Sequence, residues 1–123
     1  NGFEQITKNT STGAITTDAI YNATIRGGVQ TLSGAGAANL TDLITELTTA
    51  AGAAAVTLAD GSTSGQIKII NHIVDGGGTA TVTPTTFANG TTIAFDAVGE
   101  SVTLVWNSTV GWVASSVNGA TVS

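Results

Sequence analysis

The chain contains no cysteine, no methionine and a single proline among its 123 residues. Without cysteine there is no disulfide framework, no thiolate metal site and no thiol nucleophile. Charged residues make up 9% of the chain, whereas typical soluble domains have about a quarter. The only cations are Lys8, Arg26 and Lys68, too few to line a groove that follows a phosphate backbone. The sequence therefore predicts no nucleic-acid partner.

Long apolar runs are also missing, since no stretch approaches the roughly 20 residues that a membrane span needs. We expect no membrane partner. The surface must be covered by Thr, Ser, Asn and Gly in place of the usual charges, so like-charge repulsion contributes little to keeping copies apart. Such a composition suits a protein that works inside an assembly.

What the chain does have is a series of short β-type runs between residues 58 and 117. Apolar and Thr-rich segments of five to nine residues alternate there with Gly, Asn and Asp, which is the signal for strands joined by tight turns. The length fits one domain, residues 1–123. We predict an all-β fold, an antiparallel meander that forms a β-sandwich or a barrel-like domain and that packs as a trimer, with its core meander at residues 53–122.

Residues 34–52 fit two templates. Leu40, Leu43, Ile44 and Leu47 have the spacing of an amphipathic helix, but the threonines among them lose side-chain freedom in a helix. The alternation of Leu43, Thr45 and Leu47 fits a strand. We favour two short strands here, with the helix as the alternative.

The two ends of the chain suggest different roles. Residues 1–33 read as an N-terminal arm with short strands, in which Phe3, Ile6 and Tyr21 are the candidate attachment residues. In the core meander the expected inner face is Ile93, Phe95, Val102, Leu104 and Trp106.

The segment 66–74 is apolar on both faces, so it is either a central strand or a strand covered by another subunit. Its residues Ile70, His72 and Val74 are the candidate contacts between protomers. Trp112, near the end of the chain, is the fourth candidate. Trp106 is expected in the core.

Reactive groups are sparse. His72 is the only histidine, and a general base would need a nucleophile and an orienting group beside it. Asp60, Asp75, Asp96 and Glu100 stand at turns, where Asx side chains cap their own backbone more often than they bind calcium. The run 75–78 lacks the following helix and the lysine of a phosphate loop. We therefore expect no catalytic residue, no metal site and no cofactor.

Several stretches of the core have a familiar form: LADGSTSGQIKII, DGGGTATVTP, NGTTIAFDAVGESVTLVW and GWVASSVNGATV. Residues 53–122, which contain them, resemble a β-rich module in structural proteins of tailed phages of the marine phage and cyanophage type. In those phages the module appears in capsid decoration (cement) proteins, head fibres and tail-fibre tips. The resemblance implies a virion surface protein without enzymatic activity, commonly trimeric.

Three functions agree with these observations. In the first, the chain is a capsid decoration or head-fibre subunit that binds the major capsid protein or another virion protein, stabilises the shell and associates with copies of itself. In the second, it is a secreted filament subunit assembled by strand complementation. In the third, it is a receptor-binding fibre tip, which its low aromatic content of 5% disfavours.

Overall fold

The computed structural model describes residues 26–123, together with the backbone of β1 (Thr7–Lys8) and β2 (Ile15–Thr16), which pair with each other antiparallel. The predicted attachment residues Phe3, Ile6 and Tyr21 lie outside the described residues. The remaining strands are β3 (Val29–Ser33), β4 (Gly36–Ala38), β5 (Ile44–Thr48), β6 (Ala54–Leu58), β7 (Ile67–Val74), β8 (Ala80–Pro84), β9 (Ile93–Phe95), β10 (Ser101–Asn107), β11 (Gly111–Asn118) and β12 (Thr121–Val122).

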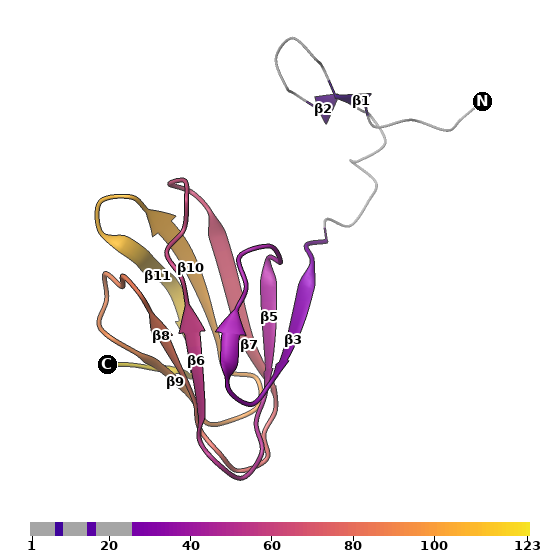
Figure 1. Cartoon of the computed structure of the whole chain (residues 1–123), viewed down its shortest axis with the longest axis vertical. Coiled ribbons are helices and arrows are strands. Elements are labelled where there is room, and N and C mark those ends of the chain that lie inside the picture. Colours follow the sequence, from indigo (N-terminus) through magenta and orange to yellow (C-terminus); the bar gives the residue numbers. More distant parts are fainter. Residues whose placement is uncertain (1–6, 9–14, 17–25) are drawn as a thin grey trace, which may run out of the picture.

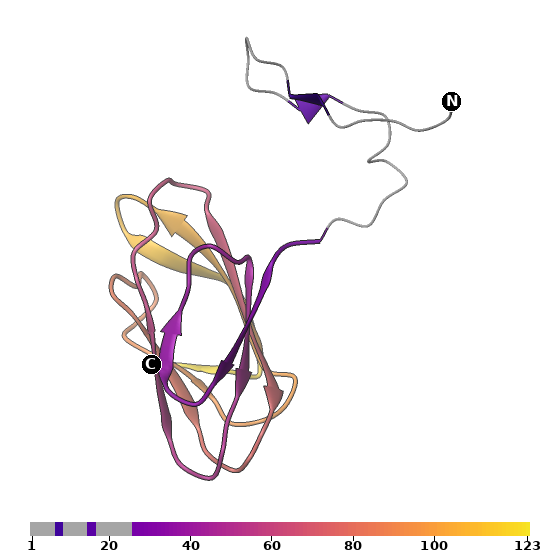
Figure 2. The ribbon, with the colours of Figure 1, turned by 45° about the vertical axis from the view of Figure 1, so that its right-hand side comes forward.

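Two five-stranded sheets face each other and enclose the core (Figures 1 and 2). One sheet, sheet B, has the order β11-β10-β7-β5-β3, and the other, sheet C, has the order β12-β9-β8-β6-β4. The predicted all-β class is confirmed. The sheets do not close into a barrel, and β7 occupies the central place in sheet B, with one of its apolar faces in the core and the other directed outward.

The prediction of a continuous antiparallel meander is wrong. The chain crosses from one sheet to the other at each step from β3 to β8, so that β3, β5 and β7 pair in parallel in sheet B and β4, β6 and β8 pair in parallel in sheet C. Within the two five-stranded sheets, antiparallel pairing begins only with β8–β9 and continues through β7–β10, β10–β11 and β9–β12. The described domain is thus three parallel turns of chain followed by an antiparallel section.

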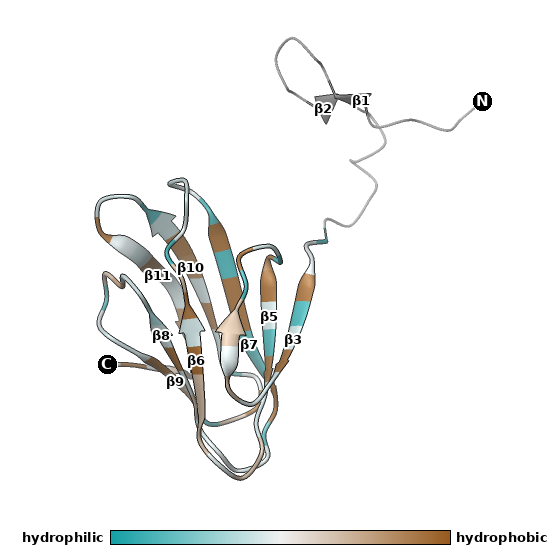
Figure 3. Ribbon diagram, in the orientation of Figure 1, coloured by the Kyte–Doolittle hydropathy of each residue, from teal (hydrophilic) through white to brown (hydrophobic). Residues whose placement is uncertain are grey.

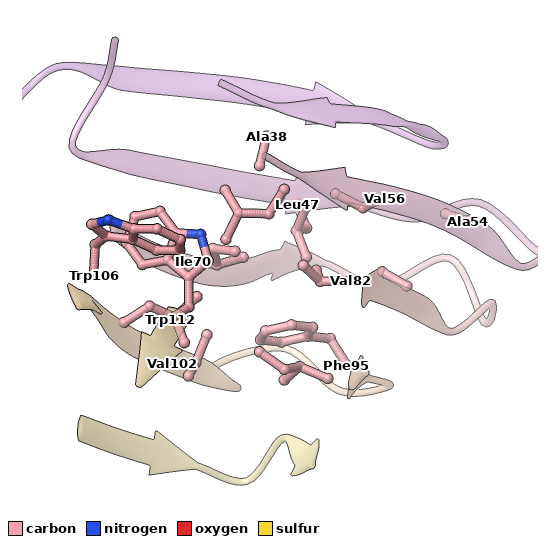
Figure 4. Packing of buried hydrophobic residues seen from close by; sticks show 14 residues of the cluster. Ala38, Leu47, Ala54, Val56, Ile70, Val82, Phe95, Val102, Trp106 and Trp112 are labelled. Atoms are coloured by element: carbon pink, nitrogen blue, oxygen red, sulfur yellow. The ribbon is translucent and has the colours of Figure 1, made fainter. Parts of the chain in front are cut away.

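The alternation of side chains in each strand creates the core. Buried positions alternate with more exposed ones in β5, β6, β7 and β10, as a strand with one face inward requires. All of the predicted inner-face residues are buried (Figure 4). Trp106 and Trp112 meet edge to face with their ring centroids 5.4 Å apart, and the indole nitrogen of Trp112 donates to the carbonyl of Ala59 at 2.9 Å.

The ambiguous segment forms two short strands, β4 and β5, and no helix. The connection between them turns on Asn39, whose side-chain oxygen accepts from the backbone N–H of Asp42 at 3.0 Å. This turn directs Thr45 and Leu47 inward, where both are buried.

Candidate interaction surface

His72 lies inside the sandwich and is 1% exposed. Its Nδ1 is 3.0 Å from the carbonyl oxygen of Ala97, which can only accept, so Nδ1 carries a proton. Its Nε2 is 3.2 Å from the hydroxyl of Thr49. The hydroxyl also accepts from the N–H of Gly76 at 3.2 Å and lies 3.4 Å from Oδ1 of Asp75.

Thr49 is itself 4% exposed, so the threonine hydroxyl and the histidine ring are covered by the chain, whereas Asp75 is exposed. Each contact joins the end of β5 to β7 or to the turn that follows β7. Its geometry fixes a turn, and a substrate has no direct approach to the hydroxyl. We therefore assign the cluster a structural role, which is to hold the turn after β7 in place.

The side chain of Lys68 also points into the sandwich and is 1% exposed. Its Nζ donates to the carbonyl oxygen of Asp42 at 2.9 Å. Burial lowers the pKa of the Lys68 ammonium from its ordinary value, and the nearby Asp42 carboxylate partly opposes this shift. The sequence analysis assigns no role to Lys68, although its position between Ile67 and Ile69, on the same strand face as Ile70, is a signal of an inward charge.

The predicted protomer contacts are placed very differently from one another. Ile70, His72 and Trp112 are buried in the core of their own chain, because their strand positions face the opposite sheet. They are therefore corrected to core residues and do not present their side chains to a neighbour. Val74, at the end of β7, is 48% exposed and is available for contact.

The outward face of sheet B carries a band of apolar side chains. Val29, Ile44 and Ile69 are aligned across β3, β5 and β7, and Ile67 is aligned with Val105 and Val113 across β7, β10 and β11. Aligned residues of neighbouring strands lie roughly 4.8 Å apart, so the side chains within each row are neighbours. The two rows adjoin on β7, where Ile67 and Ile69 are two residues apart on the same face. We call these six residues the apolar band: Val29, Ile44, Ile67, Ile69, Val105 and Val113.

The band is not covered by any described segment. Val29 and Ile67 are 48% and 47% exposed, and the other four members are half-buried by their neighbours within the sheet. Figure 3 shows brown, apolar upper ends on β3 and β5, two of the strands that contribute to the band. The next row along the strands is polar, with Thr31, Glu46 and Asn71 aligned.

The outward face of sheet C has a different character. Its positions on the five strands are all alanine or threonine: Ala37, Ala55, Thr57, Thr81, Thr83, Ala94 and Thr121. It therefore offers a small-residue surface without charge. The larger apolar side chains are on sheet B, which makes sheet B the better candidate for binding a partner.

A comparison with known protein families finds no match to this chain, and a comparison with curated proteins finds none either. Among the residues that the structure describes, no group of three or more His, Cys, Asp or Glu side chains is arranged to hold a metal ion. The part of the chain described here also contains no helix of the length and apolar character that crossing a membrane requires.

Proposed function

We propose that this chain is a non-enzymatic structural subunit of a virus particle, a capsid decoration or head-fibre protein that binds to the shell and stabilises it. The observation that supports it best is the apolar band on the outward face of sheet B. Six apolar side chains in two adjoining rows form a continuous surface, and such surfaces on small proteins mark sites of association. The viral setting comes from the resemblance of residues 53–122.

The mechanism is mechanical. Binding the band against the major capsid protein, or against another copy of the chain, removes its apolar surface from water at about 25 cal/mol per Å². Charge contributes little to this contact, because Glu46 is the one charged side chain on the outward positions of β3, β5, β7, β10 and β11. We therefore expect binding to the particle to persist at high salt.

The experiment is to locate the protein on virions of the virus that encodes it. Antibody raised against the recombinant chain and carrying a gold label is expected to decorate the head of the particle in negative-stain images. The control is antibody raised against an unrelated β-sandwich protein. Label confined to the tail tip would point to a fibre tip, and particles without label would contradict the proposal.

A second function is favoured by a separate observation. The outer edge of β3 pairs with no described strand, and β3 follows directly after the N-terminal segment. A filament subunit assembled by strand complementation needs such an open edge. Purified protein would then form open-ended fibres in negative stain, whereas a decoration subunit would form discrete particles.

The sequence-based expectation of three copies per assembly stays a prediction, and the mass of the native particle in solution tests it. The edge of β3 that pairs with no described strand suits an assembly of two copies.

A further inference from the structure

The outer edge of β3 is the unprotected edge of the described sandwich. In sheet B, β3 pairs with β5 on one side and with no described strand on the other (Figure 1). Its sequence, VQTLS, contains no proline and no charge, and its pairing with β5 shows no bulge. Proline, charged side chains and bulges are the features by which proteins commonly block an exposed edge, and β3 has none of them.

The other three sheet edges are short or are covered in part by other segments. On the outer side of β11, the backbone N–H of Trp112 donates to Thr86 and its carbonyl accepts from Ala88, and the N–H of Ala114 donates to the Asn89 side chain. Beyond Ala114 a bulge interrupts the strand.

In sheet C, the edge strand β12 has only two residues. The other edge strand, β4, is covered by a single side chain. Gln30 donates from Nε2 to the carbonyl of Ala37 at 3.0 Å, and its Oε1 accepts from the N–H of Asn39 at 2.9 Å. The contrast with β3 shows that edge protection in this domain is selective.

The residues that face the open edge follow from the ladder with β5. The carbonyl of Gly28 accepts from Ile44, and the N–H of Gly34 donates to Thr48, so the even-numbered residues between them face β5. In a strand, successive backbone groups point to opposite sides. The N–H and C=O groups of Val29, Thr31 and Ser33 therefore point outward from the sheet edge.

We propose that this edge pairs antiparallel with the same edge of a second copy of the chain, around a two-fold axis at Thr31. In that register Thr31 lies opposite Thr31 of the second copy, and Val29 lies opposite Ser33. All three are hydrogen-bonding positions, so each pair exchanges both of its backbone bonds and every outward group finds a partner. The two B sheets become one continuous ten-stranded sheet.

The charge distribution favours a second copy as the occupant. No residue of β3 is charged, so no like charges meet across the axis. The nearest carboxylate on this face, Glu46, is aligned with Thr31 one strand further in. The two copies of Glu46 are then three strand spacings apart, about 14 Å at roughly 4.8 Å per spacing, which exceeds the screening length of about 8 Å at physiological salt.

The inference does not rest on the proposed function, because an edge pair of this kind is compatible with a capsid, a filament or a free dimer. It differs from strand complementation in one respect. Pairing of identical edges closes after two copies, whereas donation of a different segment continues without limit.

Cysteine cross-linking tests both the contact and its register, because the natural chain has no cysteine. Oxidised Thr31→Cys is expected to form a covalent dimer, because hydrogen-bonded antiparallel pairs have Cα atoms about 5.5 Å apart, within disulfide reach. Val29→Cys is not expected to form this disulfide. The two copies of residue 29 would be about 14 Å apart, because they are separated by four residues along the strand. Thr57→Cys, exposed on the outward face of sheet C, is the control for random collision.

Charge complementation gives a second readout. Thr31→Lys and Thr31→Glu are each expected to raise the dimer dissociation constant at least about tenfold, because the like charges lie directly opposite. An equimolar mixture of the two is expected to restore dimers that contain one of each. Thr57→Lys is expected to dimerise as the natural chain does.

Equal cross-linking at positions 29 and 31, or dimers unaffected by Thr31→Lys, would overturn the pairing. A monomeric natural chain whose Thr31 amide resists hydrogen exchange at every concentration would also overturn it, because a segment of the same chain would then occupy the edge. Capsid labelling combined with a mass of three chains would overturn the two-fold pairing and leave the proposed function standing.

Discussion

The hydroxyl of Thr49 brings four groups together at the end of β5. It meets the ring of His72, the carbonyl of Val74, the carboxylate of Asp75 and the N–H of Gly76. In a site that is 4% exposed, water does not easily replace the lost oxygen. The arrangement makes one small side chain responsible for holding the turn after β7 against the sandwich.

We predict that Thr49→Val, which keeps the shape and removes the hydroxyl, lowers the free energy of unfolding by about 1–3 kcal/mol. Urea denaturation followed by tryptophan fluorescence measures it. Thr48→Val is the matched control, since Thr48 is the adjacent residue on the outward face and should change stability by no more than about 0.5 kcal/mol. Equal effects of the two substitutions would contradict the role of the hydroxyl.

Lys68 makes the stability depend on pH in the alkaline range. Burial lowers its pKa in the folded protein below the ordinary value of 10.5, so between the two values the unfolded chain binds more protons than the folded one. The free energy of unfolding then rises as pH increases through this window. The ammonium opposes folding below the window, and this penalty disappears as the group becomes neutral in both states.

We predict that Lys68→Met abolishes this alkaline rise. Urea denaturation of both proteins at pH 7, 8.5 and 10 gives the test, and the difference between the two curves isolates Lys68, because all other titrating groups are common to both. The natural chain should gain on the variant as pH increases. Parallel curves would show that the Lys68 ammonium is not penalised by burial.

At the scale of the elements, the turn after β7 depends on glycine because it passes close to another backbone. A Cβ atom built on Gly78 would collide with the carbonyl oxygens of Gly52 and Ala50. The N–H of Gly78 donates to the same Ala50 carbonyl at 2.8 Å, which holds the two loops in register. The connections after β5 and after β7 thus stack on each other at one end of the sandwich.

We predict that Gly78→Ala lowers the free energy of unfolding by at least about 2 kcal/mol, because rigid backbone must move to admit the methyl group. Gly52→Ala is the matched control. Its Cβ has nothing within 4 Å, so we expect it to be neutral or stabilising. Thermal unfolding followed by circular dichroism compares the two, and a Gly78→Ala protein as stable as the control would contradict the close approach.

Most strands could be predicted from the sequence, and the way they pair could not. β7, β10 and β11 lie where β-branched runs are bounded by Gly and Asn. The same Gly and Asp residues suit a hairpin turn and a turn that carries the chain to the opposite sheet, so this punctuation does not distinguish the two. The parallel turns also differ in length: Val29 aligns with Ile44, and Ile44 with Ile69, offsets of 15 and 25 residues. An irregular period leaves no repeat to detect.

The apolar band, like the pairing of the strands, could be predicted only in part from the sequence. The two apolar faces of β7 could be predicted, but which face is inward depends on its neighbours. Ile70 and His72 lie on the inner face of β7, whereas Ile67 and Ile69 lie on its outer face. The outer residues lie beside Val105 only because β7 pairs with β10. The band is assembled from strands far apart in the sequence. Residue patterns in single strands therefore could not identify it.

At the scale of the whole molecule, the band and the β3 edge belong to the same sheet and serve different contacts. The edge supplies backbone bonds in the plane of sheet B, and the band supplies apolar surface perpendicular to it. Val29 is common to both, since it is in β3 and begins the first row of the band. Pairing two copies at β3 would leave both bands on one side of the joined sheet, where a shell could bind them together.

We predict that Ile67→Lys weakens binding to virus particles at least about tenfold while it changes the free energy of unfolding by no more than about 0.5 kcal/mol. Ile67 is 47% exposed, so the lysine is solvated in the free protein, but in the complex its ammonium would be buried without a partner. Co-sedimentation with particles stripped of the protein measures the binding. Val98→Lys is the control: Val98 is 62% exposed in the turn before β10, at the opposite end of that strand from Val105. If both variants bind as the natural chain does, the partner does not contact the band, and sheet B would lose its place as the attachment face.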